Sequence, residues 1–274
     1  VSGPLLAILK LAAVALLSVG ALFAALWFFQ ENLIFMPSRL PAEHRFTLKS
    51  AFEERVLPGG AHALVIRAAK PRGLLLFFHG NAGSMESWSE VADGLVARTG
   101  WSVFIVDYPG YGKSPGSIHS EAQLHALAVE AYDAAKKEAG DMPLAIYGRS
   151  IGSGLAVKLA AERPAAALIL ESPFQSMTRM AELFYPWAPR FLLRYEFRSD
   201  REIPKVQCPV LVLHGSDDEI IPVAEGDRLS RLNERARFAS IIGGRHNDLR
   251  GYDAYWSALN RFLGEHSEKI TPKK

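Results

Sequence analysis

The chain has 274 residues, with 31 basic and 29 acidic side chains and a formal net charge of +2 at pH 7. This length is enough for one domain with a full hydrophobic core. The near balance of charge argues against a nucleic-acid partner, which calls for a strong basic excess. The single cysteine, Cys208, excludes an intrachain disulfide, and no cluster of histidine and cysteine has the spacing of a metal site. We therefore expect neither a metal nor a cofactor.

The first 30 residues are different in kind from the rest. Leu11 to Phe29 is an almost wholly apolar run of 19 residues without a charge. As a helix it would extend roughly 28 Å, close to the ~30 Å hydrocarbon core of a bilayer. Trp27, Phe28 and Phe29 resemble an interfacial aromatic belt. We predict an uncleaved anchor at residues 1–30. A cleaved signal peptide is the alternative, but its apolar region is normally shorter and no clear A-x-A site follows.

Two signals in the sequence predict opposite orientations of this anchor in the membrane. Lys10 lies on one side, whereas Arg39, Arg45 and Lys49 follow the other end, and this count slightly favours a cytoplasmic catalytic part. A single N-terminal anchor that resembles a signal sequence favours the opposite. We expect the domain to be extracytoplasmic.

After a polar connector (31–50, marked by Pro37 and Pro41), strand-like and helix-like stretches alternate through a predicted domain at 51–268, with a tail at 269–274. Strands that are apolar on both faces and alternate with helices indicate an α/β fold, a mostly parallel sheet with helices on both faces. In such a sheet the functional site lies beyond the carboxyl ends of the strands. The predicted strands are 64–68, 74–78, 102–106, 143–147, 166–170, 210–213 and 238–242, and the predicted helices are 88–98, 121–138, 153–161, 224–233 and 252–263.

The segment G-R-S-I-G at 148–152 fits the pattern G-x-S-x-G between a strand and a helix. A sharp turn there crowds the backbone, so glycine is needed on both sides, and the hydroxyl of Ser150 is held at a helix N-terminus. We predict that Ser150 is a nucleophile; the alternative is a glycine-rich turn that only joins two core elements.

The segment 174–198 breaks the alternation. It holds seven aromatic residues in 25, together with four arginines and two glutamates. We interpret it as a cap or lid insertion over the site. Its apolar face would bind acyl chains or lie against lipid, unless it is an ordinary helical insertion packed on the core.

A serine hydroxyl needs a base, and the base needs an orienting acid. The acid should follow a later strand, where Asp217 and Asp218 both stand in a polar turn. The base should follow the last strand, where His246 lies in a glycine-rich loop. His79 and His214 end strands before glycine, where an imidazole can bond loop backbone.

The developing oxyanion needs two N–H donors. One should come from Ile151, after the nucleophile, and we choose the N–H of Asn81, in the small-residue loop after 74–78, as the other. His246 would then deprotonate Ser150, and an acyl-enzyme would form and be hydrolysed.

Six stretches in the order of the chain together resemble a known family. They are H-G-N-A-G (79–83), D-Y-P-G-Y-G-K-S (107–114), G-R-S-I-G-S-G (148–154), E-S-P-F (171–174), H-G-S-D-D (214–218) and H-N-D (246–248). The chain is similar to Bem46-like α/β-hydrolases, including the membrane-anchored ABHD13- and ABHD17-type serine hydrolases. This resemblance implies the α/β-hydrolase fold, places the acid at Asp218 and the base at His246, and implies hydrolysis of esters or thioesters.

The function predicted from all of this is that of a membrane-anchored serine hydrolase acting on acyl esters, such as lysophospholipids, or on thioesters. Its partners would be a small acyl or lipid substrate and the bilayer. One alternative is a serine peptidase with the same triad. The other is a non-catalytic, hydrolase-like binding protein, which would predict a broken triad.

Overall fold

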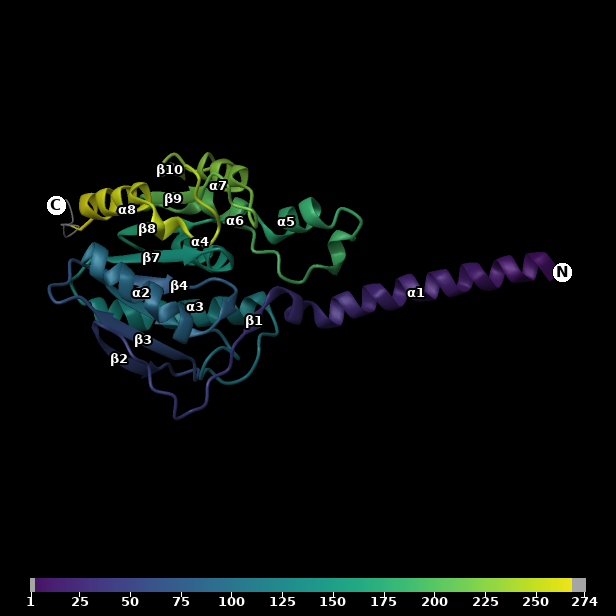
Figure 1. Ribbon diagram of the computed structural model, residues 1–274, viewed down its shortest axis with the longest axis horizontal. Coiled ribbons are helices and arrows are strands. Elements are labelled where there is room, and N and C mark those ends of the chain that lie inside the picture. The colour runs from purple at the N-terminus through teal and green to yellow at the C-terminus, as the bar shows by residue number, and fades with distance from the viewer. Residues whose placement is uncertain (1–2, 268–274) are drawn as a thin grey trace.

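The computed structural model describes residues 3–267, so the predicted tail at 269–274 lies outside the described residues. The chain begins there with α1 (Gly3–Ile34), a long helix that projects away from the rest of the molecule (Figure 1). A window of 18 residues in α1 has a mean hydropathy of 2.4 and no buried residue. The helix is therefore long and apolar enough to cross a membrane, a test that a signal sequence would also pass.

The helix α1 ends four residues later than the predicted anchor, so that the start of the predicted connector is helical. The cause is a tertiary contact. Gln30 is 5% exposed, and its amide group bonds the backbone of Leu192 and Arg194 at 3.0 and 2.9 Å. These bonds fix one more turn of helix, residues 31–34, beyond the apolar run.

The body of the molecule is built on an eight-stranded sheet with the order β10-β9-β8-β7-β4-β6-β3-β2. All neighbouring strands are parallel except the pairs β2–β3 and β3–β6. The mostly parallel α/β sheet expected from the sequence is confirmed. The strands are β2 (Ala51–Val56), β3 (His62–Arg67), β4 (Leu74–Phe78), β6 (Ser102–Val106), β7 (Leu144–Arg149), β8 (Ala167–Glu171), β9 (Val210–Gly215) and β10 (Ala236–Ile241).

Helices cover both faces of this sheet. On one face α2 and α8 enclose a core that includes Phe77 and Trp101, and on the other face α3, α4 and α7 enclose a core that includes Phe78. The helices are α2 (Met85–Thr99), α3 (Glu121–Ala139), α4 (Ile151–Glu162), α5 (Met177–Phe184), α6 (Ser199–Glu202), α7 (Val223–Ser230) and α8 (Asp253–Glu265), with short 3₁₀ turns η1 (Arg190–Leu192), η2 (Ile203–Lys205) and η3 (Leu249–Gly251).

The sequence pattern missed strand β2. Its residues are exposed or half-buried, because it is an antiparallel edge strand, and so it lacks the doubly apolar pattern of the inner strands.

The segment that leaves α1 returns at once to the sheet. Strand β1 (Met36–Pro37) pairs in parallel with β5 (Ala82–Gly83), which closely follows the carboxyl end of β4. The carboxyl ends of the parallel strands therefore face the side from which α1 projects, as Figure 1 also shows. The predicted cap segment (174–198), with α5 and η1, projects on that same side.

Candidate active site

Ser150 lies in a strained turn between β7 and α4. Its φ and ψ are 53° and −122°, a conformation that a residue with a side chain rarely adopts. A Cβ on Gly148 would lie 2.5 Å from that of Ala156, and a Cβ on Gly152 would lie 2.3 Å from the carbonyl oxygen of Phe78. Both glycines of the motif are thus required by close packing of the turn against α4 and β4.

The structure brings Ser150, His246 and Asp218 together. His246 Nε2 lies 3.2 Å from Ser150 Oγ, and His246 Nδ1 lies 2.8 and 3.1 Å from the two carboxylate oxygens of Asp218. His246 is only 4% exposed. This arrangement has the contacts that a nucleophile, a base and an orienting acid need.

Asp218 is fixed as an anion by its surroundings. Its Oδ1 accepts hydrogen bonds from the N–H groups of Ile220 at 3.0 Å and Ile221 at 2.8 Å, and His214 Nε2 lies 3.3 Å from its Oδ2. Burial alone would raise the pKa of Asp218, but hydrogen bonds from His214, His246 and Ile221 hold it well below the usual range. Asp217 is exposed and bonds Ser216 instead.

The two predicted oxyanion donors follow the carboxyl ends of β7 and β4. Ile151 is the first residue of α4, where the backbone N–H groups lack intrahelical partners. Asn81 follows β4; its side-chain Oδ1 accepts the N–H of Met36 at 3.1 Å, and its carbonyl oxygen accepts the hydroxyl of Tyr111 at 2.7 Å. The segment that leaves α1 therefore braces the loop of Asn81.

A buried ionic network beneath the site was not predicted from the sequence. Its centre is Glu171, at the end of β8, which bonds Arg149 at 2.8 Å, Arg250 at 2.9 Å and the hydroxyl groups of Tyr147 and Tyr255. Burial alone would raise the pKa of Glu171, but Arg250 and Arg149 lower it to about 2. The carboxylate is thus ionised and satisfied in the protein interior.

Arg149 connects this network to the histidine loop. Its Nη2 donates to the carbonyl oxygen of His246 and to Asn247 Oδ1, each at 2.8 Å. Its guanidinium group also lies over the ring of Trp88, 4.8 Å from the ring centre. Arg149 therefore ties the turn of the serine to the loop of the histidine. Its charge at an otherwise apolar strand end was the available sequence signal.

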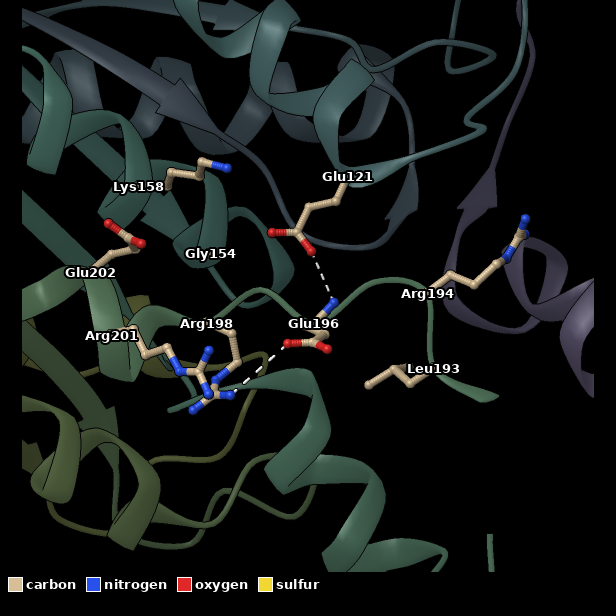
Figure 2. A pocket seen from close by; sticks show the side chains of 9 residues that line it. All are labelled: Glu121, Gly154, Lys158, Leu193, Arg194, Glu196, Arg198, Arg201 and Glu202. Carbon is tan, nitrogen blue, oxygen red and sulfur yellow. Dashed lines mark hydrogen bonds and ion pairs between the residues drawn. The ribbon is translucent and has the colours of Figure 1, made fainter. Parts of the chain in front are cut away.

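A separate cavity of about 380 Å³ lies between α4 and residues 193–202, which form the C-terminal end of the cap segment and α6 (Figure 2). None of Ser150, Asp218 and His246 lines it, and its walls are mostly charged, so it does not suit an acyl chain. Glu121 accepts the N–H groups of Glu196 and Phe197 at 2.9 and 3.0 Å, and this fixes the C-terminal end of the cap segment. The lining residues are Glu121, Gly154, Lys158, Leu193, Arg194, Glu196, Arg198, Arg201 and Glu202.

The cap divides into a buried base and an exposed tip. Phe174, Tyr195 and Phe197 are buried, whereas Phe184, Tyr185, Trp187 and Phe191 are exposed. The base is packed on the core, as an ordinary insertion would be, while the tip is not. Among residues 3–267 no group of three or more His, Cys, Asp or Glu side chains could hold a metal ion.

Comparison with known proteins gives matches over nearly the whole chain. Residues 69–199 match the family model described as "Serine aminopeptidase, S33". An uncharacterized protein of Mycobacterium tuberculosis (strain H37Rv) is 32% identical over 265 residues, which cover 93% of this chain and 94% of that protein. The alpha/beta hydrolase domain-containing protein 17B of Homo sapiens is 35% identical over 194 residues, 70% of this chain and 66% of its own length.

Solved structures share the fold. An esterase from Pyrococcus furiosus superposes with a TM-score of 0.63 at 15% identity, covering 86% of this chain and 98% of its own. Est1E from Butyrivibrio proteoclasticus, in a complex with ferulic acid, gives a TM-score of 0.63 at 24% identity, covering 76% of this chain and 96% of its own.

Proposed function

The chain belongs to the α/β-hydrolase superfamily and is ABHD17-like, and from this premise we propose that it is a membrane-anchored serine hydrolase. Its substrates would be carboxylic esters or thioesters of acyl or lipid type. The observation that carries the proposal is the continuous contact from Ser150 Oγ through His246 to the carboxylate of Asp218, at 3.2 and 2.8 Å.

The proposed reaction has two steps. His246 Nε2 takes the proton of Ser150 Oγ as this oxygen attacks the acyl carbonyl, and the N–H groups of Ile151 and Asn81 stabilise the oxyanion. Asp218 keeps the proton of the imidazole on Nδ1 and stabilises the imidazolium. His246 then protonates the leaving alcohol or thiol, and the acyl group stays on Ser150. In the second step His246 activates a water molecule, which releases the carboxylic acid and restores Ser150.

The anchoring part of the proposal is supported by α1. Its apolar run spans the thickness of a bilayer, and the rest of the chain would lie in the extracytoplasmic space. The bilayer would then be both the attachment site and a source of acyl substrates.

A serine peptidase is the second candidate, because the matching family model carries an aminopeptidase description. An aminopeptidase would need a free carboxylate to bind the α-amino group of its substrate. Near the triad, Glu171 is held by two arginines, and Glu219 accepts the N–H of His246 at 3.3 Å and lies 3.5 Å from Arg245. These engagements favour an ester or thioester over an aminoacyl substrate.

Turnover of a chain-length series tests the proposal. Oxygen esters, thioesters and aminoacyl amides are offered to the wild type, to Ser150→Ala and to Ser117→Ala, a matched change at an exposed loop serine. We expect ester or thioester cleavage that peaks at one acyl length and is lost only in Ser150→Ala. Cleavage of amides alone would select the peptidase, and equal activity in Ser150→Ala would remove Ser150 from the mechanism.

A further inference from the structure

The tip of the cap, which we define as residues 183–191, exposes large apolar side chains to solvent. Phe191 leaves 71% of its surface exposed and Trp187 leaves 58%. Leu183, Phe184 and Tyr185 are exposed beside them. Soluble monomers rarely expose such a group of neighbouring apolar side chains, and a group of this kind marks a surface that contacts something else.

The residues directly after the cap tip are hydrogen-bonded to the end of α1. Directly after the tip, the carbonyl oxygen of Leu192 accepts Gln30 Nε2 at 3.0 Å, and the N–H of Arg194 donates to Gln30 Oε1 at 2.9 Å. Glu31 forms an ion pair with Arg194 and accepts the hydroxyl of Tyr195 at 2.8 Å. The cap is therefore attached to the last two turns of α1.

These contacts fix the depth of the tip relative to the apolar run of α1. The guanidinium group of Arg194 lies over the ring of Trp27, 5.6 Å from the ring centre. Trp27 stands at the end of the apolar run, where tryptophan and tyrosine favour the membrane–water interface. If α1 spans the bilayer, the cap tip lies beside it at the level of the headgroups and the upper acyl chains.

We infer that the cap tip docks on the bilayer as a second, non-spanning membrane contact next to α1. The occupant of this surface is the lipid interface itself, and the inference rests on the anchoring part of the proposed function. Aromatic side chains such as Trp187 and Tyr185 suit this position, with the ring among acyl chains and the polar group among headgroups. Two contacts hold the carboxyl ends of the strands, and with them Ser150, toward the membrane.

Depth-dependent fluorescence quenching tests the inference in the full chain. Cys208→Ser removes the native thiol, and one new cysteine then carries a small environment-sensitive fluorophore. Pro186→Cys reports on the tip and leaves its aromatic residues in place. Leu17→Cys reports on the middle of α1, and Leu232→Cys is an exposed apolar site before the amino end of β10, at the opposite edge of the sheet. The proteins are placed in phosphatidylcholine vesicles that contain nitroxide-labelled lipid.

We expect quenching at positions 17 and 186 and none at 232. Quenching at 17 without quenching at 186 would overturn the docking of the tip and leave the anchor standing. An absence of quenching at 17 would overturn the anchor, and the inference with it. Neither outcome depends on hydrolase activity, so the failure of the proposed chemistry remains a separate result.

A second readout links the surface to turnover. The combined variant Phe184→Ser, Trp187→Ser and Phe191→Ser should lower activity on a vesicle-embedded ester about tenfold relative to a soluble short-chain ester. Leu232→Ser is the matched control and should leave this ratio unchanged. An equal loss on both substrates in the combined variant would contradict docking and indicate a role inside the site.

Discussion

The polar groups beneath the candidate active site and the apolar groups of the cap tip differ in whether they find their partners within the chain. Around Glu171 the charged groups are buried or half-buried, and each finds its partner within the chain, through Arg149, Arg250 and two tyrosine hydroxyls. At the cap tip, large apolar side chains such as Phe191 lie exposed, although burial would stabilise them. The polar groups of the candidate site are thus satisfied within the chain, whereas the proposed docking on lipid would cover the apolar side chains of the cap tip.

The largest expected effect on activity comes from removing the negative charge of Asp218. Asp218→Asn keeps the shape of the side chain but loses the anion that fixes the Nδ1–H tautomer of His246, so kcat should fall about 10³–10⁴-fold. Asp217→Asn is the matched control, since Asp217 is exposed and does not contact His246; it should stay within about twofold of the wild type. A similar loss in both variants would contradict the assignment of the acid.

Arg149→Met tests whether the buried network positions the histidine loop. The change removes the bonds to Glu171, His246 and Asn247. The free energy of unfolding should drop by roughly 3 kcal/mol in denaturant titrations, because a buried ion pair is broken. We expect kcat to fall about 30-fold with a smaller change in KM, as for a displaced base.

The matched control for Arg149 is Arg245→Met, since the side chain of Arg245 is 62% exposed. It should change stability by less than about 0.5 kcal/mol. Unchanged stability in Arg149→Met would show that the network is not needed to hold the two loops together.

The acid dependence of stability tests the same network in a second way. Because the pKa of Glu171 is lowered from 4.5 to about 2 in the fold, its contribution is present above pH 4.5 and is lost as the pH falls toward 2. The contribution amounts to roughly 3 kcal/mol at neutral pH. Unfolding midpoints between pH 7 and pH 2 should therefore fall less steeply in Glu171→Gln than in the wild type, while the exposed Glu234→Gln should follow the wild type. Parallel curves for all three would contradict the account.

The smallest expected effect is at Asn81. Its backbone N–H, the proposed oxyanion donor, remains in Asn81→Ala, and only the side-chain contacts of Oδ1 with Met36 and the hydroxyl of Tyr111 are lost. Because the donor N–H stays, kcat on a soluble ester should fall only about threefold, far less than the roughly 10²–10³-fold typical of a lost donor. Asn81→Asp keeps an acceptor for Met36 but adds a negative charge beside the oxyanion, so it should be the worse of the two. The reverse order would remove Asn81 from the oxyanion hole.

The sequence predicted most of the fold because the inner strands carry doubly apolar runs that only a covered sheet needs, as in Leu74 to Phe78. It missed β2, whose edge position leaves its residues exposed or half-buried. For the site, the strand ends indicated Ser150 and His246, but they left Asp217 and Asp218 open until the family resemblance was used. The network of Arg149 and Glu171 was missed because its partners are 22 to 98 residues apart along the chain.

The most direct test of the account is the location of the reactive nucleophile. The full-length protein is treated with an alkyl fluorophosphonate, which phosphonylates activated serines, and the adduct is mapped by peptide mass spectrometry. We predict one adduct, on Ser150, that forms rapidly in the wild type and far more slowly in His246→Ala. An adduct on another residue, or an equal rate in His246→Ala, would contradict a Ser150 nucleophile activated by His246.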